Sequence, residues 1–157
     1  MDVYQNMEAL GIILPEAPKP AGLYEPTVRF ANNLLCVSGI TPRVGGVMLN
    51  PGKVGADVSL EQAKESARQC VLNMLAVLQR DLEDLNRIKK VVKILGFVAC
   101  DGGFYEQPKV MDAASQLFID IFGVEAGKAS RSAVGAVSLP GNAPVEIEAL
   151  FELKDNN

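Results

Sequence analysis

The chain has 157 residues, of which 48% are hydrophobic and 22% are charged, a composition typical of one globular domain with a substantial core. Its formal net charge of −4 argues against a surface that follows nucleic-acid phosphates, because such surfaces depend on clustered Lys and Arg. The sequence contains no histidine, which excludes Ser-His-Asp and Cys-His nucleophilic systems and most zinc and non-haem iron sites.

The first residues predict a short helix and then an extended connector. Val3, Met7 and Leu10 recur at helical spacing, and Gly11 provides a stop. The prolines in "LPEAPKPAG" exclude a helix there. The opening residues lack the apolar core of a signal peptide, and no apolar run approaches membrane-spanning length, so we expect neither a signal peptide nor a membrane segment.

The stretch "TVRFANNLLCVSGI" predicts two strands, at about 27–31 and 34–40, around the turn pair Asn32–Asn33. The segment that follows, "PRVGGVMLNPGKVG", is punctuated by Gly and Pro. It therefore predicts a loop with one more short strand.

A long helix is expected at about 60–83. Ser59 with Gln62 three residues later forms a capping box. One apolar stripe then recurs at helical spacing: Leu60, Ala63, Ala67, Val71, Met74, Leu75 and Leu78. After it, residues 91–100 are apolar at nearly every position, which predicts a strand covered on both faces.

The last third predicts a helix at about 108–122, ended by Gly123, and then a β-hairpin. The hairpin strands are expected at 130–139 and 145–153, on either side of the turn cluster "PGN". The resulting order is β-β-α-β-α-β-β, an α+β fold with two helices packed on one face of a sheet. Residues 1–157 are expected to form a single domain.

Both faces of this sheet are predicted to be apolar. In the strand at 130–139, Ala133 and Gly135 share one side while Val134 and Ala136 share the other. Two helices can cover only one face, and large apolar patches are rarely left exposed. We therefore expect a homo-oligomer, in which other copies cover the second face.

Cys36, Cys70 and Cys100 are widely spaced and odd in number, which fits neither a disulfide framework nor a metal site. We interpret them as buried free thiols in a reducing cytoplasm. The expected location is therefore cytoplasmic, and no metal or organic cofactor is predicted.

Arg131 stands among small and apolar residues of the predicted hairpin, and two interpretations are open. It could form an ion pair with Glu146 or Glu148 across the hairpin, worth about 0.2–1 kcal/mol if exposed. Alternatively, its small neighbours leave space for its planar fork to bind a carboxylate through two parallel hydrogen bonds.

Glu148 also has two interpretations. It could be an outward residue of an alternating strand, together with Glu146 and Glu152. Leu150 lies on the same side, however, so a glutamate here could be partly buried and could hold and polarise a water molecule.

Three further residues could border a ligand site. Tyr24 could be a loop aromatic that covers the core or a hydroxyl that closes over a ligand. Ser38 and Gly39 end a predicted strand, where they could form a turn or present backbone donors to a ligand.

The stretch "ASRSAVGAVSLPGNAPVEIEAL" resembles the C-terminal signature of the RidA/YjgF family: an Arg after a small residue, an apolar strand, a short loop, and Glu-Ile-Glu after a branched residue. The likeness continues through "LLCVSGITP", "LYEP" and the helix after "ADVSLEQA". It covers roughly residues 20–153, and residues 1–20 look like an N-terminal extension.

The resemblance implies a chorismate-mutase-like fold assembled as a homotrimer, with clefts between subunits. It also implies hydrolysis of 2-imino acids and their enamine tautomers to 2-keto acids and ammonia. In that scheme Arg131 would grip the substrate carboxylate and Glu148 would orient the attacking water. Tyr24, Ser38 and Gly39 would line the cleft.

Two positions depart from the family pattern. Ala133 stands where short members carry a cysteine, and Asp112 aligns with a frequent asparagine. The site then lacks a thiol but keeps its Arg and Glu. A non-catalytic protein that binds or senses small carboxylates such as 2-keto acids is the alternative. The endoribonuclease activity ascribed to some relatives fits the acidic chain poorly, and no nucleic-acid partner is expected.

Overall fold

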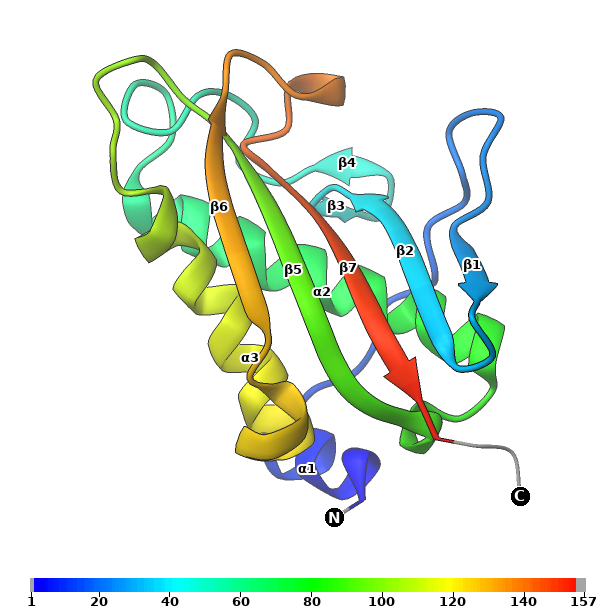
Figure 1. Ribbon diagram of the computed structural model, residues 1–157. Coiled ribbons are helices and arrows are strands. Elements are labelled where there is room, and N and C mark those ends of the chain that lie inside the picture. Colours follow the sequence, from blue (N-terminus) through cyan, green and yellow to red (C-terminus); the bar gives the residue numbers. More distant parts are fainter. Residues whose placement is uncertain (1, 155–157) are drawn as a thin grey trace.

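Residues 2–154 are described in a computed structural model, and they form an α+β fold (Figure 1). The main sheet contains β1 (Thr27–Phe30), β2 (Leu34–Ile40), β5 (Ile88–Ala99), β6 (Ser130–Ala136) and β7 (Val145–Leu153), in the spatial order β1-β2-β7-β5-β6. Two short strands, β3 (Arg43–Val44) and β4 (Val47–Met48), form a separate hairpin. The helices are α1 (Val3–Ala9), α2 (Leu60–Leu82) and α3 (Gln107–Gly127), and 3-10 turns cover Leu85–Arg87 and Pro140–Asn142.

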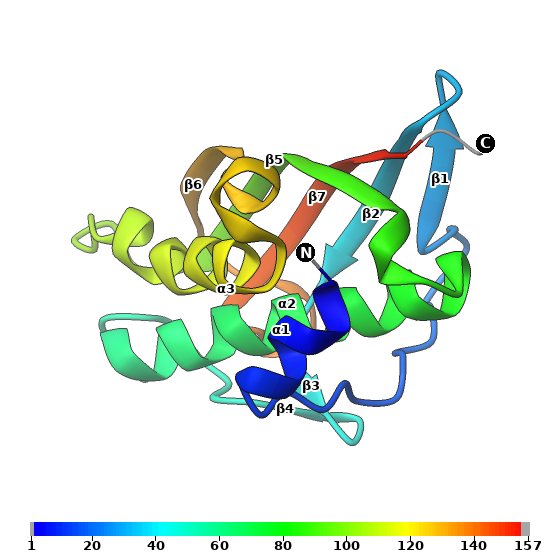
Figure 2. The ribbon, with the colours of Figure 1, turned by 90° about the horizontal axis from the view of Figure 1, so that it is seen from below.

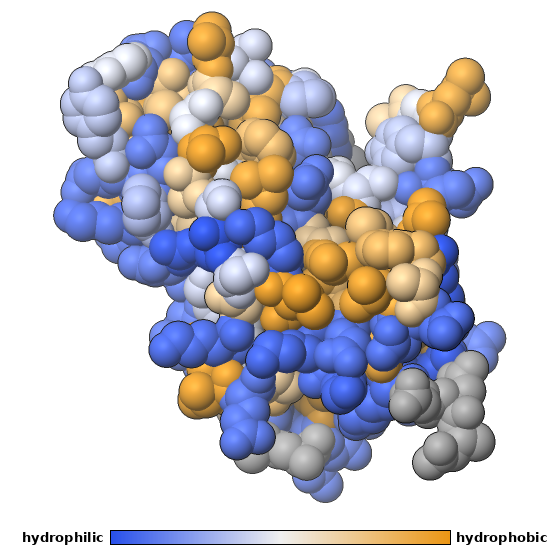
Figure 3. Space-filling model, in the orientation of Figure 1, coloured by the Kyte–Doolittle hydropathy of each residue, from blue (hydrophilic) through white to orange (hydrophobic). Residues whose placement is uncertain are grey.

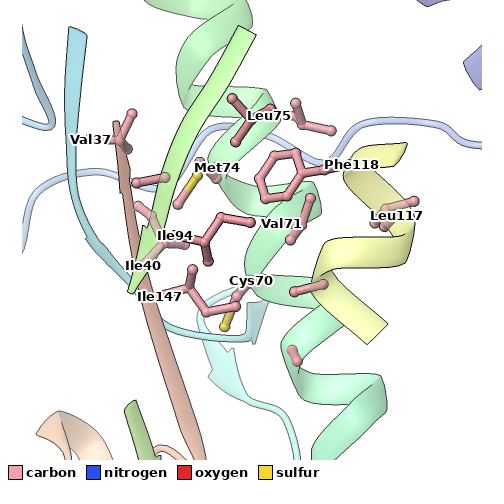
Figure 4. Packing of buried hydrophobic residues seen from close by; sticks show 14 of the residues in the cluster. Val37, Ile40, Cys70, Val71, Met74, Leu75, Ile94, Leu117, Phe118 and Ile147 are labelled. Carbon is pink, nitrogen blue, oxygen red and sulfur yellow. The ribbon is translucent and has the colours of Figure 1, made fainter. Parts of the chain in front are cut away.

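The helices form one layer and the main sheet the other (Figures 1 and 2). Helices α2 and α3 contact each other and the sheet, and α1 packs against α3. The core between the layers is continuous, and Figure 4 shows part of it. Its largest fully buried side chains include Phe118, Phe151, Leu35, Met74, Leu75 and Ile94. One sheet face is therefore covered by helices, while no helix of residues 2–154 covers the other.

Local sequence signals account for the ends of the helices. The Ser59 side chain accepts a hydrogen bond from the Gln62 backbone N–H, and the Gln62 side chain accepts one from the Ser59 N–H, which confirms the capping box that starts α2. Gly123 leaves helical geometry at φ 80°, ψ 165°, as expected of a stop, but one more turn follows it. Gly127 permits that turn, because a Cβ there would lie 2.3 Å from the Phe118 carbonyl oxygen. Within residues 2–154, no helix is long and apolar enough to cross a membrane.

The predicted elements form close to their expected positions, with additions. The short helix expected near residues 3–10 forms as α1, although the order β-β-α-β-α-β-β left it out. The β3–β4 hairpin is an addition, because only one short strand was expected there. Strand β5 begins at Ile88, earlier than residue 91, because it follows directly on the turn at Leu85–Arg87. Strand β6 ends at Ala136, earlier than residue 139.

The predicted C-terminal hairpin is wrong. Strand β6 pairs with β5 in parallel, and β7 pairs antiparallel with both β5 and β2, so β5 lies between the two supposed hairpin partners. The eight residues 137–144 and their 3-10 turn carry the chain past the end of β5. A tight turn cluster indicates a reversal of direction, but it does not determine which strand becomes the neighbour.

The sheet face away from α2 and α3, called the open face below, is partly apolar. Val28 is 52% exposed, Phe30 44% and Val134 42%, and Figure 3 shows hydrophobic surface gathered across this face. Cys36 is also exposed here, so the expectation of a buried thiol is wrong at this position, whereas Cys70 and Cys100 are buried. Cys36 pairs with Val28 on β1, and paired residues in an antiparallel ladder point to the same face.

Candidate functional site

A pocket of about 500 Å³ lies where the end of β2 meets the start of β7. We call it the β2–β7 pocket. Its lining comes from five segments: the chain before β1, the end of β2 and the turn after it, the start of β3, the 3-10 turn before β7, and β7 itself. The lining residues are Ala21, Gly22, Tyr24, Ser38, Gly39, Thr41, Arg43, Pro140, Gly141 and Glu146.

A bulge in β2 shapes the pocket. Val37 pairs with Ala149 and Ile40 with Ile147, so β2 uses one more residue than β7 over this interval. The extra length includes Gly39, and a Cβ at Gly39 would lie 2.1 Å from Glu146 Oε1. The missing side chain therefore leaves the space that the Glu146 carboxylate occupies.

Glu146 has the electrostatic character of a proton-transfer group. It is partly buried, and burial is the main cause that raises its pKa above the ordinary value of a glutamate. The negative charge of Glu148 raises the pKa of Glu146 further. A higher pKa makes a carboxylate a stronger base, so Glu146 accepts a proton more readily than an ordinary glutamate does.

Two hydroxyl groups border the same pocket. Tyr24 is 48% exposed, and its Oη accepts a hydrogen bond from the Ala21 N–H at 3.3 Å. Ser38 Oγ donates to the Glu25 carbonyl at 2.7 Å, which leaves its lone pairs available as acceptors. The Tyr24 hydroxyl proton and the Ser38 oxygen are thus a donor and an acceptor for a small polar ligand.

Glu148 lines a different depression. It is exposed on the open face and borders a hollow of about 260 Å³ together with Cys36 and Lys93. Ser38 borders both this hollow and the β2–β7 pocket. Glu148 is therefore close enough to Glu146 to affect its pKa, but it does not line the pocket.

Arg131 lies on the other face of the sheet. It stands beside Ile94 of β5, which is 1% exposed and faces the helices. Its Nη1 donates to Asp112 Oδ1 at 2.8 Å and to Ser115 Oγ at 3.0 Å, both on α3. The predicted alternative of an ion pair with Glu146 or Glu148 is therefore wrong. Ala133, two residues along β6, faces the same way as Arg131.

A single chain thus brings together only part of the predicted site. Tyr24, Ser38 and Gly39 line one pocket, whereas Arg131 and Ala133 lie at the far edge of the sheet. The order β2-β7-β5-β6 separates β2 from β6 by three strand spacings, roughly 14 Å. The roles of Arg131 and Glu148 in binding and catalysis stay predictions.

Sequence reasoning missed two pocket residues, Glu146 and Arg43. Glu146 had been considered as an outward residue of the strand and as an ion-pair partner of Arg131, but not as a pocket residue, because the alternation "VEIE" does not show which glutamate meets the β2 bulge. Arg43 follows the "SGITP" stretch and was assigned to a loop. Within residues 2–154, no three His, Cys, Asp or Glu side chains gather in a way that could hold a metal ion.

Residues 2–154 thus define a class of protein: an α+β fold with one sheet face free of helices and a pocket of mixed polar and apolar lining at the β2–β7 junction. The family model described as "YjgF/chorismate_mutase-like, putative endoribonuclease" matches residues 5–153. The chain belongs to this family, as its C-terminal signature indicated.

Several relatives share almost the whole chain. Protein TCP17 of Trypanosoma cruzi is 41% identical over 98% of this chain and 95% of its own length. The 2-iminobutanoate/2-iminopropanoate deaminase of Dermatophagoides farinae is 28% identical over 91% and 95%. The crystal structure of Atu1372, a protein of unknown function from Agrobacterium tumefaciens, is similar with a TM-score of 0.88 and 39% identity, over 97% of this chain and 92% of that one.

Proposed function

We propose that the protein hydrolyses 2-imino acids and their enamine tautomers to 2-keto acids and ammonia, at clefts between copies of the chain. The observation that carries this proposal is Glu146: a partly buried carboxyl group with a raised pKa, in a pocket lined by hydroxyls, in a chain that has no histidine. The relative named as a 2-iminobutanoate/2-iminopropanoate deaminase supports the same reaction class.

Arg131 supplies the anion anchor in this proposal. The hydrogen bonds described for its guanidinium use only Nη1, which leaves Nε and Nη2 for a ligand carboxylate. Asp112 and Ser115 hold the fork in place, so less side-chain entropy is lost when a ligand binds. Besides this anchor, the reaction needs only a placed water and a proton-transfer group, because an imine carbon is already electrophilic.

The cleft is proposed to lie between copies because Arg131 and Glu146 face opposite sides of one sheet. They can share a ligand only if Arg131 comes from one copy and the β2–β7 pocket from the next. The exposed apolar residues of the open face, among them Val28, Phe30 and Val134, give such copies a surface to pack on. A homotrimer, the assembly that the family resemblance implies, is the proposed form.

The chemistry needs no external redox partner. Water attacks the carbon of the protonated imine while Glu146 takes one proton of the water, and a neutral carbinolamine forms. Glu146 then gives that proton to the nitrogen. The C–N bond breaks as the hydroxyl proton passes to Glu146, so that the carbonyl forms and ammonia leaves, and Glu146 finally releases the proton to solvent. The balance is one imino acid plus one water to one 2-keto acid plus one ammonia. In this scheme Glu148 acts on the pKa of Glu146 rather than on the water.

A turnover assay tests the proposal. An amino-acid oxidase generates 2-iminopropanoate or 2-iminobutanoate in situ, and the release of ammonia is followed with and without the protein. We expect an acceleration that disappears in Glu146→Gln, because an amide cannot accept the proton. Arg131→Lys should weaken the binding of pyruvate by about tenfold to a hundredfold in calorimetry, because it loses a charge-assisted bidentate contact worth roughly 1.5–3 kcal/mol.

The outcomes separate the candidate functions. Pyruvate binding without any acceleration, even at high protein concentration, rejects the deaminase and favours a sensor of small carboxylates. RNA binding that weakens steeply with added salt would instead favour the endoribonuclease label of the family. The formal net charge of −4 makes that result unexpected.

A further inference from the structure

Arg43 is a cation that the proposed reaction does not use. It begins β3 and lines the β2–β7 pocket, and it also lines two adjoining hollows together with Lys19. Among residues 2–154, the ion pairs formed by arginines and lysines do not include Arg43. A guanidinium without a carboxylate partner at the wall of a pocket is available to an anionic ligand.

The protein nevertheless holds Arg43 in a defined place. The side chain of Asn73, which is 2% exposed, donates to the Arg43 carbonyl at 2.9 Å and to the Thr41 carbonyl at 3.0 Å. Arg43 Nη1 donates to the Gly46 carbonyl at 2.8 Å. A buried amide thus fixes the backbone, and the short β3–β4 hairpin fixes one end of the fork.

The second end of the fork is unoccupied and faces the loop before β7. A Cβ at Gly141 would lie 2.5 Å from Arg43 Nη2, so a side chain at this position would crowd the guanidinium. Gly141 has φ 65°, a conformation in which glycine is favoured, so backbone geometry also contributes to the choice of residue. No hydrogen bond of Nη2 or Nε is described, and both remain donors for a ligand.

We propose that Arg43 is a specificity-determining residue that binds a second acidic group, so that the site prefers 2-imino acids whose side chain ends in a carboxylate. This inference rests on the proposed function. If Arg131 of one copy holds the carboxylate next to the imine carbon, that carbon faces Glu146, and the substrate side chain extends into the pocket that Arg43 lines. Substrates of this class include 2-iminosuccinate and 2-iminoglutarate.

The pocket is suited to such a side chain in size and charge. Its volume of about 500 Å³ exceeds what a methyl or ethyl group fills, and it falls in the usual range for small-ligand sites. Arg43 supplies the positive charge in its lining, and Glu146 is the acidic residue there. Lys19 adds a second positive charge in the adjoining hollows.

Calorimetry with stable product acids tests the inference without relying on turnover. The probes are 2-oxoglutarate, which carries the second carboxylate, and 2-oxobutanoate, which lacks it. We expect the unmodified protein to bind 2-oxoglutarate at least about fivefold more tightly, a modest factor because Arg43 is exposed to solvent. Arg43→Met should abolish this preference and leave the affinity for 2-oxobutanoate within about twofold.

Two further variants control the comparison. Arg68→Met removes the same charge from an exposed position on α2 outside the pocket, and it should keep the preference. Arg43→Lys keeps the charge without the fork and should give an intermediate value, which also protects the test should Arg43→Met fold poorly. Equal affinities in the unmodified protein, a preference that survives in Arg43→Met, or binding of neither acid would each overturn the inference.

The parallel turnover arm separates this inference from the proposed function. It compares kcat/KM for 2-iminoglutarate and 2-iminobutanoate, each generated in situ. If both are hydrolysed equally well and Arg43→Met changes neither, the deaminase stands and the role of Arg43 is rejected. If neither is hydrolysed while the 2-oxoglutarate preference depends on Arg43, the deaminase is rejected and the dicarboxylate site stands.

Discussion

Adding one methyl group at Gly39 should displace the carboxylate on which the proposed chemistry depends. In Gly39→Ala the new Cβ would lie 2.1 Å from Glu146 Oε1, 3.0 Å from Cδ and 3.3 Å from Cγ. Carbon and oxygen atoms that are not bonded do not approach to 2.1 Å, so the carboxylate has to move by about 1 Å to restore ordinary contact. Gly39 is not in the positive-φ region, so the backbone itself is not strained by alanine.

The cost of this movement should be catalytic rather than structural. A misplacement of about 1 Å can reduce a rate by roughly a hundredfold, and the loss of a general base costs about a hundredfold to ten-thousandfold. We expect kcat for imine hydrolysis to fall by about a hundredfold. Since the carboxylate can turn into the open pocket, the free energy of unfolding should change by only about 1 kcal/mol.

Initial rates of ammonia release measure the effect, and the melting temperature monitors the fold. Gly102→Ala is the matched control, because a Cβ at Gly102 meets no atom within 4 Å and its φ is not positive. It should leave kcat unchanged. An unaltered kcat in Gly39→Ala would refute the assignment of Glu146 as the proton-transfer group.

Three further predictions follow from the pKa of Glu146 and from the start of α2. Glu148→Gln removes a charge that raises the pKa of Glu146, so the acid limb of the kcat/KM profile should move to lower pH; a limb that stays in place would contradict the coupling. A carboxyl group whose pKa is raised on folding favours the folded state below its unfolded pKa, and this contribution is lost as pH rises through the folded pKa. Glu146→Gln should therefore have a larger free energy of unfolding than the unmodified protein at pH 7, and this difference should shrink as pH falls toward the ordinary glutamate pKa of 4.5. Urea denaturation at fixed protein concentration measures it, and a difference that does not change with pH would contradict the prediction. Ser59→Ala removes one half of the capping box of α2 and should lower the free energy of unfolding by about 1 kcal/mol without altering kcat. If urea denaturation shows no measurable decrease in this free energy, the cap is redundant.

Local patterns predicted the elements of this fold well. The capping box at Ser59, the apolar stripe of the following helix and the alternation in β7 each depend on residues a few positions apart. Strand β7 spans Val145–Leu153, as the pattern predicted. These signals are strong because the physics that produces them is confined to one turn of helix or one strand.

Pairing between distant strands was the part that local patterns could not predict. The turn cluster before β7 suggested a hairpin of β6 and β7. Strand β5 lies between them instead, and it pairs with β6 along one edge and with β7 along the other. The position of Arg131 relative to Glu146 depends on that insertion. Which of Glu146 and Glu148 lines the pocket depends instead on the bulge in β2, which local patterns also could not predict.

Arg43 illustrates a second limit. Nothing in the sequence marks this residue, because its neighbours in the pocket come from segments before β1, at the end of β2 and in the loop before β7. Only the folded chain brings its guanidinium to the pocket that contains Glu146.

Complementation between two inactive variants tests most directly the claim that each site combines Arg131 of one copy with Glu146 of the next. Arg131→Met and Glu146→Gln are each expected to be inactive. When the two are unfolded together and reassembled in equal amounts, about one quarter of the clefts in a randomly mixed symmetric oligomer should carry both native residues, and activity should return to that level. A mixture of Glu146→Gln with Gly39→Ala should stay inactive, because both changes affect the pocket of a single chain. If the Arg131→Met and Glu146→Gln mixture remains as inactive as its components, the two residues do not meet between copies and the proposed site is wrong.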